Sequence, residues 1–383
     1  MTAWIAIFIP IVVALILLFF FRKNTTFWEI ALLIAPSALL ILIMNLIMVS
    51  SNESDTEYRG SYVTKVIYYQ AWDEEVSCRH SYRCNCSTDK NGHESCSTCY
   101  EHAYDVDYHP ECWSKVTNTG AEYGISKQHF LELQKQFATQ PYFVDMHRDY
   151  HSIDGDAYYT DWNKKPETAD IVSTEHSYKN KVQASKSIFK FDVIDEQTKK
   201  TWGLYDYPKL SGLYQSMVLG HGVNYATDKK LQYLNGYYGV NKQFRMYILF
   251  FKNQSIEAAF KQRSYWEGGN KNEFVVCIGT NKLGQYQWNK CFSWMDKPDL
   301  EVRVQDWLND EKNHHNGIDL NNFADWMPKQ IEQHWQRKRF RDFEYLNVEI
   351  SPFQLMWILI ITGLYNIGMC IWIIMNEFKN END

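Results

Sequence analysis

The sequence predicts a membrane-anchored α+β protein, in which two N-terminal transmembrane helices and one C-terminal transmembrane helix enclose a large folded region. Three long apolar segments lie near the two ends of the chain. Roughly 300 residues separate the second segment from the third, enough for one or two domains at about 150 residues each. Strand-like and helix-like patterns alternate in this region. They predict a β-rich module followed by a small α/β sandwich.

The apolar segments cover residues 2–21, 27–49 and 353–375. Each approaches or exceeds the roughly 20 residues that cross a bilayer core at about 1.5 Å per residue. Only Glu29, near the start of the second segment, interrupts their uncharged character. The first segment lacks the basic start and small-residue cleavage site of a signal peptide, so we expect it to remain as an anchor.

Two basic regions bear on orientation. Arg22 and Lys23 lie in the short loop between the first two segments, and the positive-inside rule places such a loop in the cytoplasm. Residues 50–352 are then extracytoplasmic, with a bacterial inner or cell membrane as the expected location. The run "RKRFRDF" at 337–343 favours the opposite orientation by itself, but long domains translocate largely regardless of charge.

The extramembrane region begins with a Cys-rich β module at 58–125, followed by a β-rich region at 126–239. In the module, "YRGSYVTKVIYY" and "HAYDVDYHP" have the composition and alternation of strands. Between them, the Asp-Lys-Asn-Gly stretch at 89–92 is typical of a turn. These features predict a long hairpin or a small sheet with a cysteine-bearing tip. The spacing of Phe130, Leu131, Leu133 and Phe137 predicts a short helix over 127–138.

The final part of the region, at 240–345, predicts an α/β domain. Its elements follow the order β–α–β–β–α, which is typical of a sandwich. The last helix is expected to begin at the N-cap residue Asp319. The predicted segments are "RMYILFF", "SIEAAFKQRSYWEGG", "NEFVVCIG", "QYQWNKCFSW" and "DLNNFADWMPKQIEQHWQRK".

The segment "YWEGGNKNEFVVCIG", with the order of elements around it, resembles the TPM domain. That resemblance implies a membrane-anchored extracytoplasmic domain, associated in some members with phosphatase activity and in others with assembly or repair of membrane complexes. Glu273 and the pair Ser293–Trp294 stand where the family pattern has glycine, which argues against a phosphatase. With "HAYDVDYHP" and "YWEGGNKNE", the whole chain also resembles uncharacterised membrane-anchored proteins of bacteria or their phages.

Six cysteines between residues 78 and 112 have the spacing C-x5-C-x-C-x9-C-x2-C-x12-C. Zinc ribbons use two C-x2-C knuckles, and only Cys96–Cys99 has that form, although His80, His93, His102 and His109 can add ligands. An extracytoplasmic location favours disulfides, so zinc at this cluster is the second interpretation. A further pair, Cys277 and Cys291, is expected either to bond across the hairpin of the sandwich or to be two buried core thiols. The disulfide candidates are Cys78, Cys84, Cys86, Cys96, Cys99, Cys112, Cys277 and Cys291.

A second polar cluster lies in "MHRDYHSIDGDAYYTD". On a strand, alternate residues point to one face, and a divalent metal can take imidazole and carboxylate ligands. In the alternative interpretation, "DGD" is the solvated turn of a polar hairpin. The candidate metal ligands are His147, Asp149, His151, Asp154 and Asp156.

A third cluster mixes aromatic and basic side chains just before the last apolar segment. Such residues anchor helices at the headgroup layer, so membrane lipids are an expected partner. The predicted membrane-interface residues are Trp335, Arg337, Lys338, Arg339 and Arg341.

The function that these patterns favour is non-enzymatic. The sequence lacks the G-x-S-x-G, H-E-x-x-H and P-loop motifs, and its formal net charge of −7 over 383 residues argues against a nucleic-acid partner. We expect a protein that interacts with a membrane or extracytoplasmic protein, or assembles a membrane complex. The alternative is a metal-dependent, phosphatase-like hydrolase that uses the His/Asp cluster at 147–161.

Overall fold

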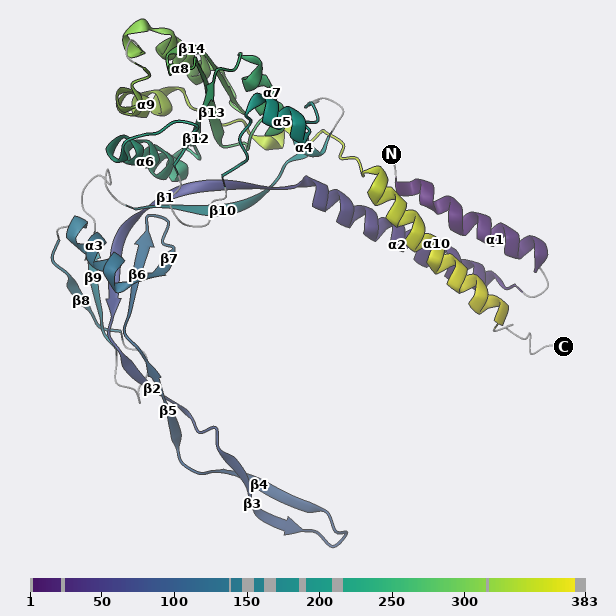
Figure 1. Ribbon diagram of the computed structural model, residues 1–383. Coiled ribbons are helices and arrows are strands. Elements are labelled where there is room, and N and C mark those ends of the chain that lie inside the picture. The colour runs from purple at the N-terminus through teal and green to yellow at the C-terminus, as the bar shows by residue number, and fades with distance from the viewer. Residues whose placement is uncertain are drawn as a thin grey trace.

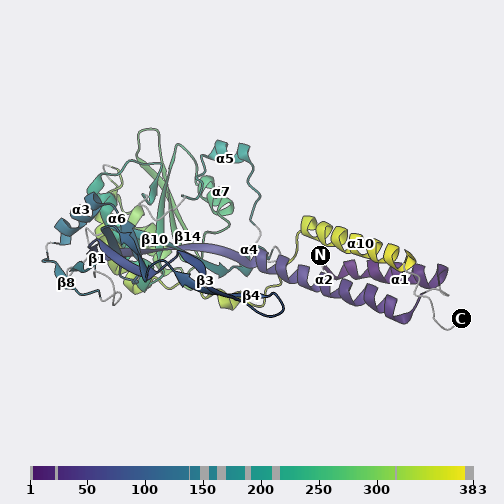
Figure 2. The ribbon, with the colours of Figure 1, turned by 90° about the horizontal axis from the view of Figure 1, so that it is seen from below.

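The computed structural model describes residues 3–21, 25–137, 139–146, 155–161, 170–185, 191–208, 216–314 and 317–375. The described chain has three parts: a bundle of apolar helices, a body built on two larger sheets, and a long two-stranded arm (Figure 1). The bundle extends from one side of the body, and Figure 2 shows the same separation from below.

The three predicted apolar segments are helices that are long and apolar enough to cross a membrane. They are α1 (Phe8–Phe20, preceded by a 3-10 turn at Ala3–Ile7), α2 (Phe27–Glu53) and α10 (Pro352–Met375). Inside the bundle, Asn366 Nδ2 donates a hydrogen bond of 3.0 Å to Ser37 Oγ. Glu29 completes a capping box with Thr26 at the start of α2, which explains the one carboxylate in this segment.

Strand β1 (Ser54–Tyr69) begins at the residue after α2 ends. Its first half pairs with β10 (Ile171–Lys179), and its second half lies between β6 (Cys112–Thr117) and β9 (Ala157–Asp161). The sheet is completed at its edges by β7 (Glu122–Ile125) and β8 (Tyr142–Val144). The predicted helix is confirmed as α3 (Lys127–Phe137), whose apolar face packs on β1.

The second sheet has the order β11-β12-β13-β14. The first three strands are parallel and β14 is antiparallel to β13. Buried residues run along almost all of the two central strands, as expected for strands covered on both faces. The bounds are Val218–Leu219, Arg245–Lys252, Glu273–Thr280 and Tyr286–Ser293.

Helices cover both faces of this sheet. The larger core, on one face, lies under α6 (Tyr225–Asn241), α8 (Asp299–Asn309) and α9 (Leu320–His334), and α7 (Glu257–Tyr265) packs on the other face. The predicted elements are present as β12, α7, β13, β14 and α9, with Asp319 as the N-cap of α9, but the predicted order lacks α8, which lies between β14 and α9. Because α6 and β11 also belong to the sandwich, it begins before the predicted residue 240. The remaining short helices are α4 (Lys181–Ala184), α5 (Glu196–Trp202) and the 3-10 turns Glu311–Asn313 and Phe340–Phe343.

The body is held together where α6 crosses β1. A Cβ atom added at Gly60 of β1 would lie 2.1 Å from the backbone oxygen of Asn235, and one added at Gly239 would lie 2.4 Å from the oxygen of Gly60. Glycine is therefore required for this close approach of two backbones. The Asn235 side chain bonds the backbone of Met246 in β12, accepting at 2.7 Å and donating at 3.0 Å. One helix thus links β1 to the sandwich.

We predict that Gly60→Ala lowers the free energy of unfolding by about 1–3 kcal/mol or more, because the added methyl group overpacks two backbones. Thermal unfolding of the full chain in mild detergent, followed by tryptophan fluorescence, measures the effect. Gly124→Ala in β7 is the matched control, since a Cβ there meets nothing within 4 Å. Equal melting temperatures for the two variants would contradict the prediction.

Candidate functional site

The arm is the most unusual part of the described chain. It consists of the ribbon β2–β5 (Trp72–Ser77 with Tyr104–His109), continued by the ribbon β3–β4 (Ser81–Thr88 with Glu94–Tyr100). At about 3.3 Å per residue, it extends roughly 50 Å from the body, as Figure 1 shows. Every residue from 72 to 109 is described, and Cys78 is the only buried one. The arm therefore has no hydrophobic core of its own.

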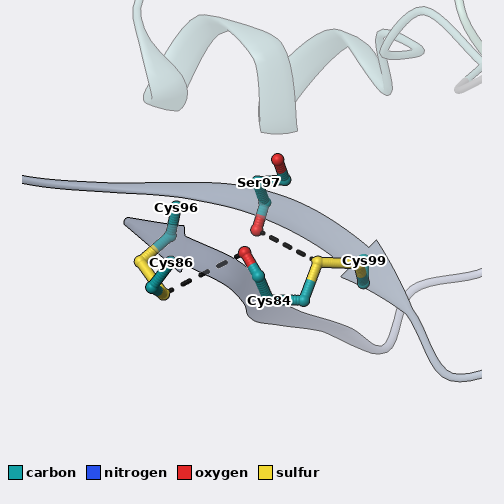
Figure 3. Close-up of a disulfide and its surroundings, with 5 residues drawn as sticks. All are labelled: Cys84, Cys86, Cys96, Ser97 and Cys99. Atoms are coloured by element: carbon teal, nitrogen blue, oxygen red, sulfur yellow. Dashed lines mark hydrogen bonds between the residues drawn. A yellow bond between two sulfur atoms is a disulfide. The ribbon is translucent and has the colours of Figure 1, made fainter. Parts of the chain in front are cut away.

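Two disulfides staple the outer ribbon: Cys84–Cys99 and Cys86–Cys96 (Figure 3). The strand register shifts between Cys84 and Ser87, at a bulge where Asn85 has a φ of 47°. The expected disulfide chemistry is confirmed for these four cysteines. The thiols of the single C-x2-C knuckle are both used in disulfides, so that knuckle offers no thiolate to zinc.

The disulfides explain how so exposed a ribbon can fold. An isolated two-stranded hairpin is marginally stable in water. The two bonds close loops with sequence separations of 15 and 10 residues, and a disulfide that closes a loop of about 15 residues contributes about 3 kcal/mol by constraining the unfolded chain. Covalent bonds here replace the stabilisation that burial supplies elsewhere.

The other two cysteines of the predicted cluster lie outside these pairs. Cys78 is a buried free thiol where the two ribbons meet, and its Sγ lies 3.5 Å from the backbone oxygen of His80. Cys112 is in β6, opposite Tyr69 at the base of the arm. Nine residues of extended chain, or about 30 Å, separate the level of Tyr69 from Cys78. The prediction of a third disulfide in this module is therefore wrong.

Of the two alternatives for Cys277 and Cys291, the structure has the buried thiols and not the bond. The strand register pairs Cys277 with Lys290 and Cys291 with Val276, so the two thiols point to opposite faces of the sheet. Cys291 belongs to the larger core and Cys277 to the smaller one. Burial raises the pKa of both thiols. They are core residues.

The predicted His/Asp metal cluster falls mostly outside the described residues. The described residues do not include His147, Asp149, His151 or Asp154. Asp156 is described, and its backbone oxygen accepts a hydrogen bond of 2.9 Å from Gln70 just before β9.

The predicted membrane-interface residues have different environments. Trp335 is 4% exposed, packs its ring edge-on against Phe244, and donates from Nε1 to the oxygen of Lys242 at 3.1 Å. It is instead a core residue of the sandwich, because it follows directly on the apolar face of α9. The Lys338 ammonium lies 5.4 Å from the ring centre of Phe343.

A buried carboxylate organises the nearby cations. Glu57 of β1 is fully buried, and its Oε1 lies 2.7 Å from Arg59 Nε and 3.8 Å from Lys271 Nζ. Its Oε2 lies 3.6 Å from Arg337 Nη1. Burial lowers the pKa of Lys271, and the charges of Arg337 and Arg59 act in the same direction while Glu57 opposes them. Three cations thus surround one anion.

A basic cavity of about 490 Å³ opens beside this cluster. Six of its lining residues are basic and one, Glu344, is acidic. Lys179 and Lys181 also pair with Glu53, the last residue of α2, at 3.7 and 3.9 Å. The cavity therefore lies beside the end of an apolar helix and suits an anionic group. The basic lining residues are Lys179, Lys181, Lys271, Arg337, Arg339 and Arg341.

No family model, curated protein or solved structure matches the chain. The functional conclusions below therefore rest on the residues and geometry described above.

We predict that Cys84 pairs with Cys99, and Cys86 with Cys96, in the purified full chain. Trypsin cleavage after Arg83 and Lys90 places the partners on two peptides, so mass spectrometry without reduction should find these peptides linked. The variant Cys86→Ser/Cys96→Ser should keep the link through the remaining native pair.

The matched control is Cys86→Ser/Cys99→Ser, which leaves Cys84 and Cys96 from different pairs and should give two alkylated thiols. Persistent linkage in this control, or alkylation of all four cysteines in the unaltered chain, would contradict the assigned pairing.

Proposed function

We propose that this chain is a non-enzymatic integral membrane protein whose residues 50–352 are extracytoplasmic and act in protein interaction or in assembly of a membrane complex. The observation that carries the proposal is the arm, a disulfide-stapled ribbon with almost no buried surface. Such an element contributes little to the stability of the body. Its extension away from the body instead suits contact with a partner.

The disulfides support the proposed orientation, because such bonds persist in oxidising compartments. The loop residues Arg22 and Lys23 favour the same orientation by the positive-inside rule. The opposing basic run at 337–343 has a structural use, since Arg337 faces the buried Glu57 and the neighbouring arginines line the cavity. This use weakens that run as a topology signal.

The surface of the arm supports a protein partner. Tyrosine is enriched in the core of protein interfaces, and large aromatic anchors contribute much of their binding energy. The arm exposes five large apolar or aromatic side chains: Tyr82, Tyr100, Tyr104, Val106 and Tyr108. The order β12–α7–β13–β14 in the sandwich supports the proposed TPM likeness and, with it, a role in assembly.

We also propose that the basic cavity binds the phosphate headgroup of an anionic membrane lipid. The lysines that pair with the end of α2 bring the cavity to the level at which that helix would leave a bilayer. Each basic side chain near an anionic surface contributes about 1 kcal/mol of attraction.

For the arm, we expect a photo-cross-linking amino acid at Tyr108 or Tyr82 to form a discrete adduct with a protein partner in native membranes. The same amino acid at Leu283, which is 83% exposed on the sandwich, is the matched control and should give no such adduct. Identical products at all three positions, or none at any, would count against the arm as the contact surface.

For the cavity, we expect the full chain to retain phosphatidylglycerol in preference to phosphatidylcholine during purification from mixed vesicles, as measured by native mass spectrometry. Arg339→Gln/Arg341→Gln should reduce that preference several-fold, because two lining charges are lost. Arg303→Gln, an exposed change on α8, should leave it intact. Equal retention of the two lipids by the unaltered chain would refute the headgroup site.

A further inference from the structure

The joint between the two ribbons of the arm brings together residues that the disulfides do not use. Cys78, His102 and Asp105 each place a ligand atom within 4.8 Å of the other two. The ring centre of His80 lies 5.7 Å from that of His102. Cys78, His80 and His102 come from the two short connections that separate β2–β5 from β3–β4, and Asp105 lies near the start of β5.

We propose that Cys78, His102 and Asp105, with His80 as the fourth ligand, form a zinc site that locks the joint of the arm. Zinc is bound in proteins by thiolate, imidazole and carboxylate in a tetrahedron, at about 2.0–2.3 Å from each ligand atom. Ligand atoms within 4.8 Å of one another can therefore converge on one ion with small side-chain movements. A mixed sulfur and nitrogen set selects zinc over magnesium or calcium, which prefer all-oxygen sites.

Contacts around the cluster orient its candidate ligand Asp105. Asp105 Oδ2 accepts a hydrogen bond of 2.7 Å from the backbone N–H of Arg79, and its Oδ1 lies 2.5 Å from His102 Nε2. The Arg79 guanidinium also pairs with Asp107. Outer contacts of this kind orient metal ligands. The Arg79 N–H holds Oδ2 of Asp105 in place, while Oδ1 points to His102.

The state of Cys78 is the second independent observation. Four other cysteines of the arm are oxidised, whereas Cys78 is a free thiol and the only buried residue of a ribbon that the structure describes in full. Coordination by zinc would account for a thiol kept beside two disulfides. On binding, the thiol loses its proton to solvent and the ion takes the thiolate, with no change in oxidation state.

The second group of ligand atoms on the arm, Cys86, Glu94 and Cys96, does not compete. Both of its sulfur atoms belong to one disulfide. The proposed zinc site and the disulfide-bonded outer ribbon are therefore separate features of the same arm. The zinc proposal does not depend on which partner the arm contacts.

The test uses the full chain, purified in mild detergent through a tag without histidine. Elemental analysis should find about one zinc per chain. Cys78→Ser and His102→Ala should each reduce this content to near zero. The matched controls, Cys370→Ser in α10 and His93→Ala in the exposed turn of the arm, should retain it.

A second measurement separates loss of the site from loss of the fold. Cobalt added to the metal-free chain should produce a thiolate-to-cobalt charge-transfer band, which Cys78→Ser should abolish while the Cys84–Cys99 and Cys86–Cys96 bonds stay intact in non-reducing peptide maps. In the unaltered chain, a chelator should increase alkylation of Cys78, and zinc should reverse that increase. A cobalt band that survives Cys78→Ser, or Cys78 alkylation that ignores both chelator and zinc, would overturn the proposal.

Discussion

Strand β1 is the element on which the other parts of the structure depend. It continues directly from α2, pairs with β10, β6 and β9, and packs against α6 at Gly60. Its buried Glu57 is the shared counter-ion of Arg59, Lys271 and Arg337. Removing one partner from a buried charge group costs about 3–5 kcal/mol. The strand therefore couples the apolar bundle to the body through both close packing and charge.

The body and the arm are stabilised by different physical means. The sandwich buries continuous apolar strands between helices on two faces, so its stability comes mainly from apolar burial. The arm, by contrast, buries only Cys78 among residues 72–109, and its disulfides restrict the unfolded chain instead. An oxidising compartment is thus a condition for the arm but not for the sandwich. The proposed extracytoplasmic location and the proposed contact role both follow from this difference.

Local patterns predicted much of the fold. The apolar segments, the amphipathic helix α3, the strand β12 and the Asp319 cap are each read from neighbouring residues. Helix α6 was missed because Gly236 and Gly239 lower helix propensity, and their purpose becomes visible only when β1 lies against the helix. Helix α8 carried a signal that could have revealed it: Leu300, Val304 and Leu308 recur every four residues.

The sequence alone determined which segments are apolar enough for a membrane and that one module has enough cysteines for disulfides. It also located three of the four strands and two of the four helices of the sandwich. These properties depend on composition and on periods of two to four residues. Only the tertiary structure decided that Cys84 pairs with Cys99 and Cys86 with Cys96, while Cys78 remains a thiol. It also decided that Cys277 and Cys291 face opposite cores and that Trp335 is buried. Strand register and the packing of distant segments set these outcomes, and neither is encoded in the spacing of neighbouring residues.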